Sequence, residues 1–298
     1  MIAEFLAMGI RRAIRRARFR IGRLSTALAV FIHPFRASDR LDELTVENAQ
    51  LLKIVDASGQ LRPPPAHLQR RVIGEHVPHF IEGGRAVLDD IERVLAREGL
   101  DLGKFNRVLD FGCGCGRVTQ HLRARLSEEA EIVATDIDPE AIDWCRQHYG
   151  TSARFCVNPD QPPTEFADGH FDFVVSISIF THLPEELQNA WLRELARIAR
   201  PGGYLLLTVH GPKHFDKIPN RVRGSFDRDG FAFVRGAGTE GLPAFYQTTF
   251  HTHDYIRREW SRYLDILGIF PVAISHHQDA VLCRTPDQNT RALGSAQK

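Results

Sequence analysis

The residues with the clearest chemical potential form a glycine-rich loop after a short apolar run. Residues 108–118 read Val-Leu-Asp-Phe-Gly-Cys-Gly-Cys-Gly-Arg-Val, with glycines at positions 112, 114 and 116. Glycine lets the backbone turn sharply and approach a ligand without a Cβ in the way. Asp136 ends a second apolar run 20 positions after Gly116, and a carboxylate at this distance typically accepts hydrogen bonds from ribose hydroxyls. The spacing therefore predicts a cofactor that contains a nucleoside.

The glycine spacing also excludes two common nucleotide sites. A dinucleotide fingerprint, G-x-G-x-x-G, would need glycine at position 117, where the chain has Arg117. The chain contains no G-K-S or G-K-T run, so the phosphate-binding loop of ATP and GTP enzymes is not expected.

The elements that must position this loop follow from a change of periodicity at residue 107. Short β-branched or aromatic runs predict strands at 107–111, 132–135, 154–157, 171–177, 204–209, 269–275 and 280–283. Apolar spacing of three and four predicts helices between them, at 118–126, 139–148, 184–199 and 253–267. This alternation indicates an α/β fold with a doubly wound, mostly parallel sheet. Ligands bind such sheets beyond the carboxyl ends of the strands, near the topological switch point.

Taken together, these motifs resemble the class I S-adenosylmethionine-dependent methyltransferase family. Its first motif is an acidic residue followed by G-x-G-x-G, as in Asp110 and the loop after it. Residues 136–139 resemble the family's ribose-binding turn, 171–178 its fourth strand and 200–207 the turn into its fifth strand. The resemblance covers about 105–285. It implies a seven-stranded sheet and S-adenosylmethionine as the cofactor.

The resemblance also implies roles for individual residues. Asp110 and the three glycines would surround the methionine portion, while Asp136 would hold the ribose hydroxyls and Ile137 would lie against the adenine. Asn158 stands where the family usually has an acid or amide near the adenine. The implied cofactor-binding residues are Asp110, Gly112, Cys113, Gly114, Gly116, Asp136, Ile137 and Asn158. The cysteines of the loop would contribute backbone and packing only.

Transfer of a methyl group to a hydroxyl requires a nearby base, and histidine is the usual one near neutral pH. His182 follows the predicted fourth strand and is the first candidate, with His251 the second. His253 and His210 are weaker candidates, and His276 and His277 are expected to be exposed or structural. Each of these side chains could instead orient a loop or cap a helix. A metal site is not expected, since neither the loop cysteines nor these histidines have companions at a ligand spacing typical of metal sites.

The rest of the chain divides into an arm, a cap and a tail. Residues 1–40 form a basic arm, 41–104 a helical cap segment, 105–285 the cofactor-binding domain and 286–298 a flexible tail. Within the cap, a helix is expected over about 77–98, bent or interrupted at Gly83 and Gly84. Within the domain, 211–250 form an insertion after strand five. Residues 230–234 and 245–250 of this insertion alternate like a β-hairpin that could wall off a pocket over the cofactor.

The arm carries nine arginines against two acidic residues, with an apolar stripe at positions 6, 10, 13, 14, 17, 21, 24 and 28. This pattern is typical of a basic amphipathic helix on an anionic membrane surface, so residues 1–30 could bind membranes peripherally. A lid or packing helix, or a targeting segment, fits the same pattern.

Composition limits the partners. The net charge of +1 gives no global reason to expect nucleic acid. Five cysteines without a C-x-x-C pair indicate a reducing, cytoplasmic compartment. The leading interpretation is O-methylation of a small molecule or glycan. The preference for a glycan rests on a resemblance to methyltransferases that have the same run L-R-P-P-P-x-H-L, at 61–68 in this chain, and the same glycine loop. A protein or nucleic-acid methyltransferase, or a non-enzymatic cofactor-binding scaffold at a membrane, are the alternatives.

Overall fold

The computed structural model describes residues 62–74, 79–236 and 241–287 of the 298-residue chain. The chain divides into two units, Met1–Arg62 and Pro63–Lys298. The basic arm of 1–40 and most of the 286–298 tail lie outside the described residues.

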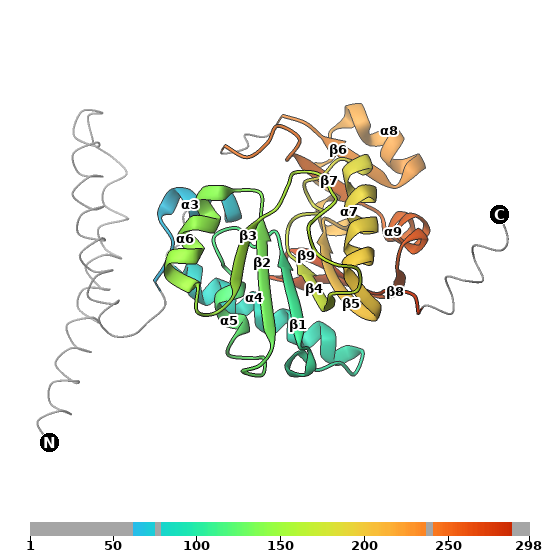
Figure 1. Ribbon diagram of the computed structural model, residues 1–298. Helices are drawn as coiled ribbons and strands as arrows, with labels where there is room; N and C mark the ends of the chain where they lie inside the picture. The colour runs from blue at the N-terminus through green and yellow to red at the C-terminus, as the bar shows by residue number, and fades with distance from the viewer. Residues whose placement is uncertain (1–61, 75–78, 237–240, 288–298) are drawn as a thin grey trace, which may run out of the picture. The chain divides into compact units, whose positions relative to one another are not determined.

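The second unit is built on a seven-stranded sheet with the order β3-β2-β1-β4-β5-β9-β8 (Figure 1). The strands are β1 (Arg107–Phe111), β2 (Glu131–Asp136), β3 (Arg154–Val157), β4 (Phe171–Ser176), β5 (Ala199–Val209), β8 (Asp265–Ile274) and β9 (Gln278–Arg284). The first five strands run parallel, whereas β9 is antiparallel to both β5 and β8. The chain order reverses between β1 and β4, which confirms the doubly wound, mostly parallel sheet expected from the sequence.

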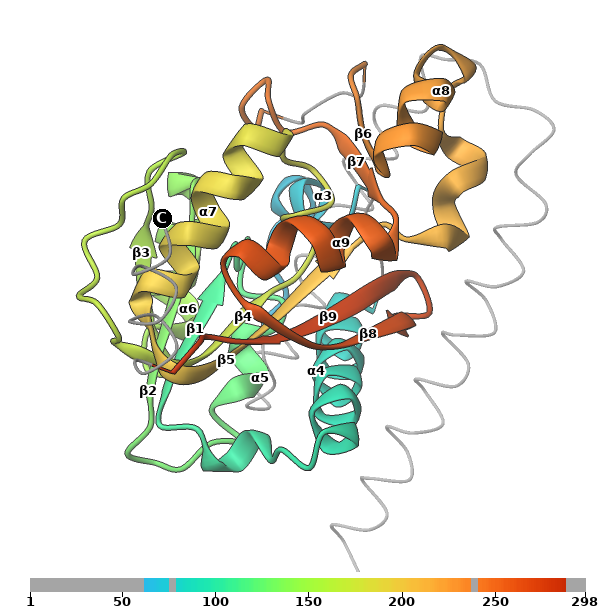
Figure 2. The same ribbon diagram turned by 90° about the vertical axis from the view of Figure 1, so that its right-hand side faces the viewer.

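Helices cover both faces of this sheet. The helices of the described residues are α3 (Ala66–Ile73), α4 (Phe80–Arg97), α5 (Thr119–Leu122), α6 (Pro139–Tyr149), α7 (Glu185–Ile198), α8 (Asn220–Asp229) and α9 (His253–Glu259). Figure 2 shows α4 and α5 against one face and α7 and α9 against the other. Alternate residues of a strand point to opposite faces, so Val108 packs in the cluster of α4 while Leu109 packs in the cluster of α7.

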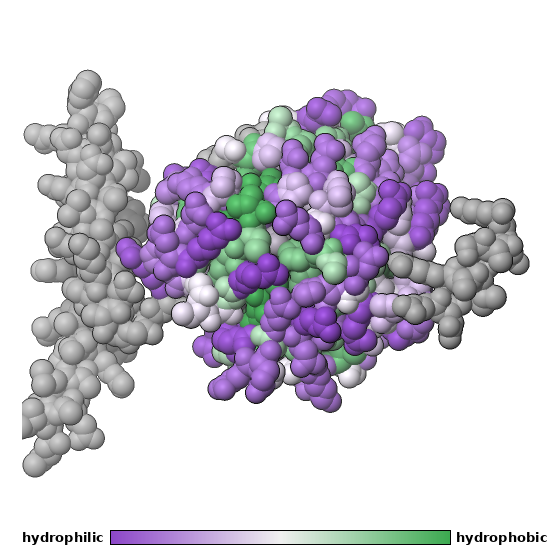
Figure 3. Space-filling view, in the orientation of Figure 1, coloured by the Kyte–Doolittle hydropathy of each residue, from purple (hydrophilic) through white to green (hydrophobic). Residues whose placement is uncertain are grey.

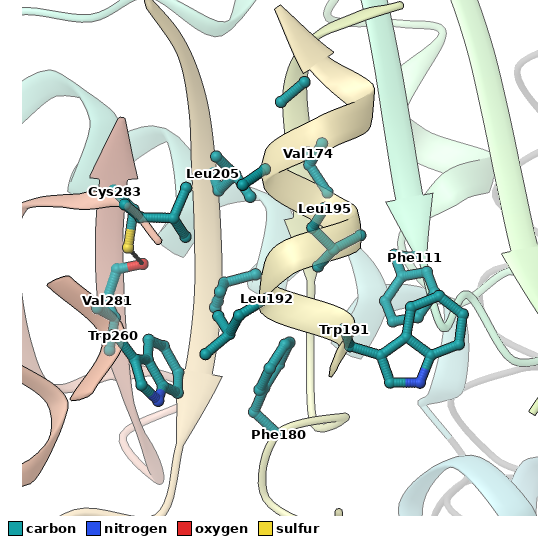
Figure 4. Close-up of a cluster of buried hydrophobic side chains, with 14 of the residues drawn as sticks. Phe111, Val174, Phe180, Trp191, Leu192, Leu195, Leu205, Trp260, Val281 and Cys283 are labelled. Atoms are coloured by element: carbon teal, nitrogen blue, oxygen red, sulfur yellow. Dashed lines mark hydrogen bonds between the residues drawn. The ribbon is translucent and has the colours of Figure 1, made fainter. Parts of the chain in front are cut away.

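The larger core cluster lies between α7 and the sheet (Figure 4). Trp191, Leu192 and Leu195 recur at helical spacing on one side of α7 and are all buried. Each fully buried side chain of this size contributes about 1.5–3 kcal/mol. This packing fixes α7 on β4 and β5, so the loop that joins β4 to α7 starts from rigid elements.

The helix expected near 77–98 is α4, and it runs through Gly83 and Gly84 without interruption. The expectation of an interruption there was wrong, and Gly84 instead allows a close approach. A Cβ at Gly84 would lie 1.9 Å from the carbonyl oxygen of Arg117. The helix therefore touches the backbone of the segment that follows the glycine loop.

Two further elements differ from expectation. The last helix, expected over 253–267, ends at Glu259, and a short 3₁₀ turn (Trp260–Arg262) leads into β8. Within the insertion, β6 (Phe231–Val234) pairs antiparallel with β7 (Thr248–His251) as the expected hairpin, but α8 was not anticipated. Its ten residues contain few apolar side chains, and only Phe226 is buried.

The face of the molecule in Figure 3 is largely hydrophilic, with apolar side chains gathered in a narrow band near its middle. Among the described residues, no helix combines the length and the apolar character needed to cross a membrane.

Candidate functional site

The glycine loop is tied to the end of β2 by backbone hydrogen bonds. The N–H groups of Gly112 and Cys113 donate to the carbonyl oxygen of Thr135 at 2.8 and 2.9 Å. The three glycines have φ angles of +79°, +54° and +78°, a region that other residues rarely adopt. At Gly114 a Cβ would also lie 2.5 Å from a methyl carbon of Val72 in α3. The loop geometry therefore requires glycine and brings the backbone close to α3.

Helix α3 lies over the loop because its charges pair with the start of α6. Arg71 contacts carboxylate oxygens of Asp138 and Glu140, each at 2.7 Å. Together the loop, α3 and the segments after β2, β3 and β4 enclose a cavity, called here the glycine-loop cavity. Its lining includes Leu68, Val72, Gly112, Gly114, Asp136, Ile137, Asn158, Ser178 and Tyr246.

Two polar side chains of this lining have unused hydrogen-bonding capacity. The Asp136 carboxylate accepts from the N–H of Gly114 at 2.7 Å and from that of Asp138 at 2.9 Å. A carboxylate has about four lone-pair sites, so two remain. Burial raises the pKa of Asp136 to about 6. Asn158 is buried, and its Oδ1 has no hydrogen-bond partner among the described residues. Both groups can therefore accept from a ligand.

Of the expected cofactor-binding residues, five line the glycine-loop cavity: Gly112, Gly114, Asp136, Ile137 and Asn158. The other three lie beside it. Asp110 is buried, accepts from the hydroxyl of Thr119 at 2.5 Å, and has a pKa raised to about 6 by burial. Cys113 is buried, and desolvation raises its thiol pKa well above the usual value. A Cβ at Gly116 would lie 2.9 Å from the ring of Tyr149, so that glycine allows packing against α6.

A second cavity of about 440 Å³ adjoins the first. It is called here the histidine cavity, and its lining includes Arg70, Arg117, His182, His210, Gln247, His277 and Gln278. The two cavities share six lining residues: Arg71, Val72, Ile177, Ser178, Leu242 and Tyr246. Ligands in the two cavities would therefore meet at the carboxyl end of β4.

Ser178 marks this junction with an uncommon backbone conformation. Its φ is +65°, which costs a residue with a Cβ roughly 1–2 kcal/mol. Surrounding bonds hold it there: its N–H donates to Thr208 Oγ1 at 2.7 Å, and its hydroxyl accepts from Gln278 Nε2 at 2.7 Å. Strain of this kind collects at functional sites. Nothing in the sequence around Ser178 signals it.

His182 lies in the histidine cavity, close to the junction. Its Nδ1 is 2.5 Å from the carbonyl oxygen of Gln247, so Nδ1 carries the proton and Nε2 has the lone pair. The ring stacks on Tyr246 with centres 4.2 Å apart. Burial lowers the pKa of His182, so the ring is neutral near pH 7 and can accept a proton.

The structure places the second catalytic candidate elsewhere. His251 is fully buried, its ring packs near Phe231 and Trp260, and its Nε2 lies 2.9 Å from Gln188 Oε1. It lines neither cavity, because its position in β7 points it into the core. His253 pairs with Asp279 at 2.7 Å.

Two side chains of the histidine cavity were missed by sequence reasoning. Tyr246 comes from the segment before β7, where the aromatic pattern predicted a pocket wall but no single residue. Arg117, which ends the glycine motif, is half-buried in the lining, and its Nε has no hydrogen-bond partner within the described part of the chain. Burial lowers the pKa of Arg117. No carboxylate pairs with it among the residues that the structure describes.

Comparisons with known proteins place this geometry in a family. Residues 108–203 match a family whose description is methyltransferase domain. The chain carries a class I S-adenosylmethionine-dependent methyltransferase domain. Over 121 residues the chain is 33% identical to a fatty-acid O-methyltransferase from Mycolicibacterium smegmatis, an alignment that covers 41% of the chain and 42% of the relative. Over 115 residues it is 30% identical to a malonyl-[acyl-carrier protein] O-methyltransferase from Hahella chejuensis, which covers 39% of each.

The chain thus spans about two fifths of the length of these curated relatives. Among solved structures, the PH0226 protein from Pyrococcus horikoshii OT3 superposes with a TM-score of 0.52 at 16% identity, over 70% of this chain and 96% of that one. This likeness shows the shared fold.

The cofactor of this family, S-adenosylmethionine, fits the glycine-loop cavity on two local observations. Asp136 has lone pairs left for two ribose hydroxyls. Asn158 offers a carbonyl oxygen without a partner, which suits an amino group of adenine. When bound, the cofactor supplies an electrophilic methyl group on a sulfonium.

Proposed function

We propose that this methyltransferase transfers the methyl group of S-adenosylmethionine to an oxygen atom of a small acceptor bound in the histidine cavity. The proposal depends on one observation above all, which is that the two cavities share six lining residues, among them Ile177 and Ser178 directly after β4. In-line displacement at a methyl group needs the nucleophile held close and in line. The shared wall around Ser178 and Tyr246 is where these groups would meet.

A hydroxyl acceptor, including that of a glycan, would use His182 as its base. The hydrogen bond to Gln247 and the stack on Tyr246 orient the ring, and Nε2 has the lone pair that takes the proton. Loss of a general base typically lowers the rate about 10²–10⁴-fold. We therefore expect His182→Ala to lower kcat at least about 100-fold while the affinity for S-adenosylhomocysteine stays unchanged.

Arg117 favours a second acceptor class, a carboxylic acid. Its guanidinium lines the histidine cavity without a carboxylate partner in the described ranges, so an anionic acceptor would balance its charge. The two named relatives act on a fatty acid and on a malonyl group, both of which contain a carboxyl group. A carboxylate is already ionised at neutral pH, so it would not need His182 as a base.

One experiment separates these classes. The purified full chain is incubated with methyl-labelled S-adenosylmethionine and cell extract, and the labelled product is treated with mild alkali. An ester releases its label as methanol, whereas an ether retains it.

Kinetics with the identified acceptor then follow. If the acceptor is a carboxylic acid, Arg117→Met should raise KM about 10- to 150-fold, because it removes a hydrogen bond to a charged group. His182→Ala should then change kcat only a few-fold. Arg228→Met is the matched control, because Arg228 is exposed and pairs with Asp229. Transfer to no acceptor, with normal cofactor binding, would refute the proposed function.

A further inference from the structure

Three histidines from separate segments meet beside the histidine cavity, which two of them line. His210 follows β5, His214 lies in a short 3₁₀ helix (Pro212–Lys217) and His277 lies in the turn between β8 and β9. One ring nitrogen of each lies within 4.8 Å of a ring nitrogen of the other two. The ring centres are 4.7 Å apart for His210 and His214, 4.4 Å for His214 and His277, and 5.8 Å for His210 and His277.

Backbone carbonyls fix the proton on two of these rings. Nε2 of His214 is 2.7 Å from the carbonyl oxygen of His277, and Nδ1 of His210 is 3.2 Å from that of Thr249. A carbonyl oxygen only accepts, so these nitrogens carry the hydrogens and the other nitrogen of each ring has the lone pair. Histidines that bind metal commonly donate their second N–H to such a carbonyl, which orients the ring.

We propose that His210, His214 and His277 bind a divalent transition-metal ion such as Zn²⁺, with a coordination position open toward the histidine cavity. Three imidazoles around one zinc ion at about 2.0–2.1 Å place their ring centres about 5 Å apart, and the observed separations bracket that value. The all-nitrogen donor set suits zinc, copper, nickel or iron. Magnesium and calcium prefer oxygen ligands.

The open position is what would connect this site to the acceptor. His210 and His277 line the histidine cavity, and the ring of His182 is 6.1 Å from that of His210. Three protein ligands and one open position are the arrangement of catalytic zinc sites. An acceptor oxygen could complete the coordination and would be held near His182. This last step rests on the proposed function, whereas metal binding itself does not.

Part of this site could have been recognised from the spacing of two histidines in the sequence. His210 and His214 are four positions apart, but His214 was not among the histidines considered from the sequence, and no metal site was expected. The third ligand, 63 positions beyond His214, comes from a turn that only the tertiary structure brings to the pair.

The test measures metal binding by the full chain, freed of any polyhistidine tag and treated with a chelator. Calorimetric titration with ZnCl₂ should show one tightly bound ion per chain, and zinc should raise Tm because it stabilises the folded state alone. His277→Ala should weaken zinc binding at least about 100-fold, because it removes a ligand. Removal of a residue that only hydrogen-bonds to a ligand typically costs about 10- to 100-fold. His277 is exposed, so this variant is expected to fold even if His214→Ala does not.

His276→Asn is the matched control, since His276 is exposed, neighbours the site and has a φ of +51° that asparagine tolerates. It should bind zinc like the wild type. Cobalt substitution provides a second readout: nitrogen ligation gives a visible spectrum without the thiolate charge-transfer band that binding by the loop cysteines would produce. No stoichiometric binding by the wild type, equal binding by His277→Ala and His276→Asn, or a thiolate band would each overturn the proposal. The test measures metal binding and not activity, so its result can be interpreted even if the proposed function is wrong.

Discussion

Asp136 is the residue at which cofactor binding can be tested most directly. Its carboxylate accepts one backbone N–H on each oxygen, from Gly114 at 2.7 Å and from Asp138 at 2.9 Å. Two lone-pair sites remain for ribose hydroxyls. In Asp136→Asn one oxygen becomes an amide NH₂, which must face one of these backbone donors. The variant loses the negative charge and one acceptor, each of which strengthens bonds to the ribose.

The expected loss follows from the value of a hydrogen bond to a charged group, about 1.5–3 kcal/mol. At 1.4 kcal/mol per tenfold, Asp136→Asn should weaken the binding of S-adenosylhomocysteine about 10- to 150-fold. The pH dependence should change as well. Burial raises the pKa of Asp136 from its ordinary value to about 6, and the ionised form accepts both hydroxyls. Wild-type affinity should therefore be constant above about pH 7 and fall by up to tenfold per pH unit below the pKa.

Isothermal titration calorimetry between pH 5 and pH 8 measures both effects. Asp110→Asn is the matched control, because Asp110 is also buried and also has a pKa raised to about 6, yet it does not line the glycine-loop cavity. This control should keep the wild-type affinity at pH 8 and lose affinity on acidification. Wild-type affinity in Asp136→Asn, or an unchanged pH profile in that variant, would refute the assignment of Asp136 to the ribose.

The remaining predictions concern stability, measured by urea denaturation. Gly84→Ala should lower the free energy of unfolding by roughly 1–3 kcal/mol, because its Cβ would lie 1.9 Å from the Arg117 carbonyl oxygen. Gly224→Ala, which has nothing within 4 Å of the new Cβ, should raise the free energy of unfolding by up to about 1 kcal/mol. Equal effects of the two substitutions would contradict this reasoning. Asp110→Asn should leave the free energy of unfolding nearly unchanged below about pH 4 and raise it by at most about 3 kcal/mol above pH 6. The folded-state pKa of Asp110, about 6, exceeds the ordinary 3.8. The wild type therefore loses the stability tied to protonated Asp110 as the pH rises through the folded-state pKa, whereas asparagine does not titrate. His251→Ala should cost roughly 2–4 kcal/mol by leaving a cavity in the core, with no change in cofactor affinity; a large loss of kcat at full stability would return His251 to the active site.

Local sequence features were sufficient for the sheet and for the cofactor loop. The strand at 107–111 and the strand at 154–157 were predicted with the bounds that the structure shows, because alternation and β-branched residues act over a few neighbours. The glycines at 112 and 114 and the acid at 136 are likewise readable, since a positive φ and a carboxylate at a strand end are properties of single positions. Gly83 and Gly84 were misread because their neighbour Arg117 is more than 30 positions away.

The choice among the 14 histidines was beyond local reasoning. His182 reaches the histidine cavity because Gln247, 65 positions later, holds its ring, and His251 is buried because β7 faces α7 and α9 at that position. Sequence by itself determined the fold class, the cofactor loop and the cofactor. The lining of the histidine cavity by Arg117 and Tyr246 and the cluster of three histidines were decided only by tertiary structure. Each of these contacts joins segments whose meeting depends on how the insertion and the last strands pack.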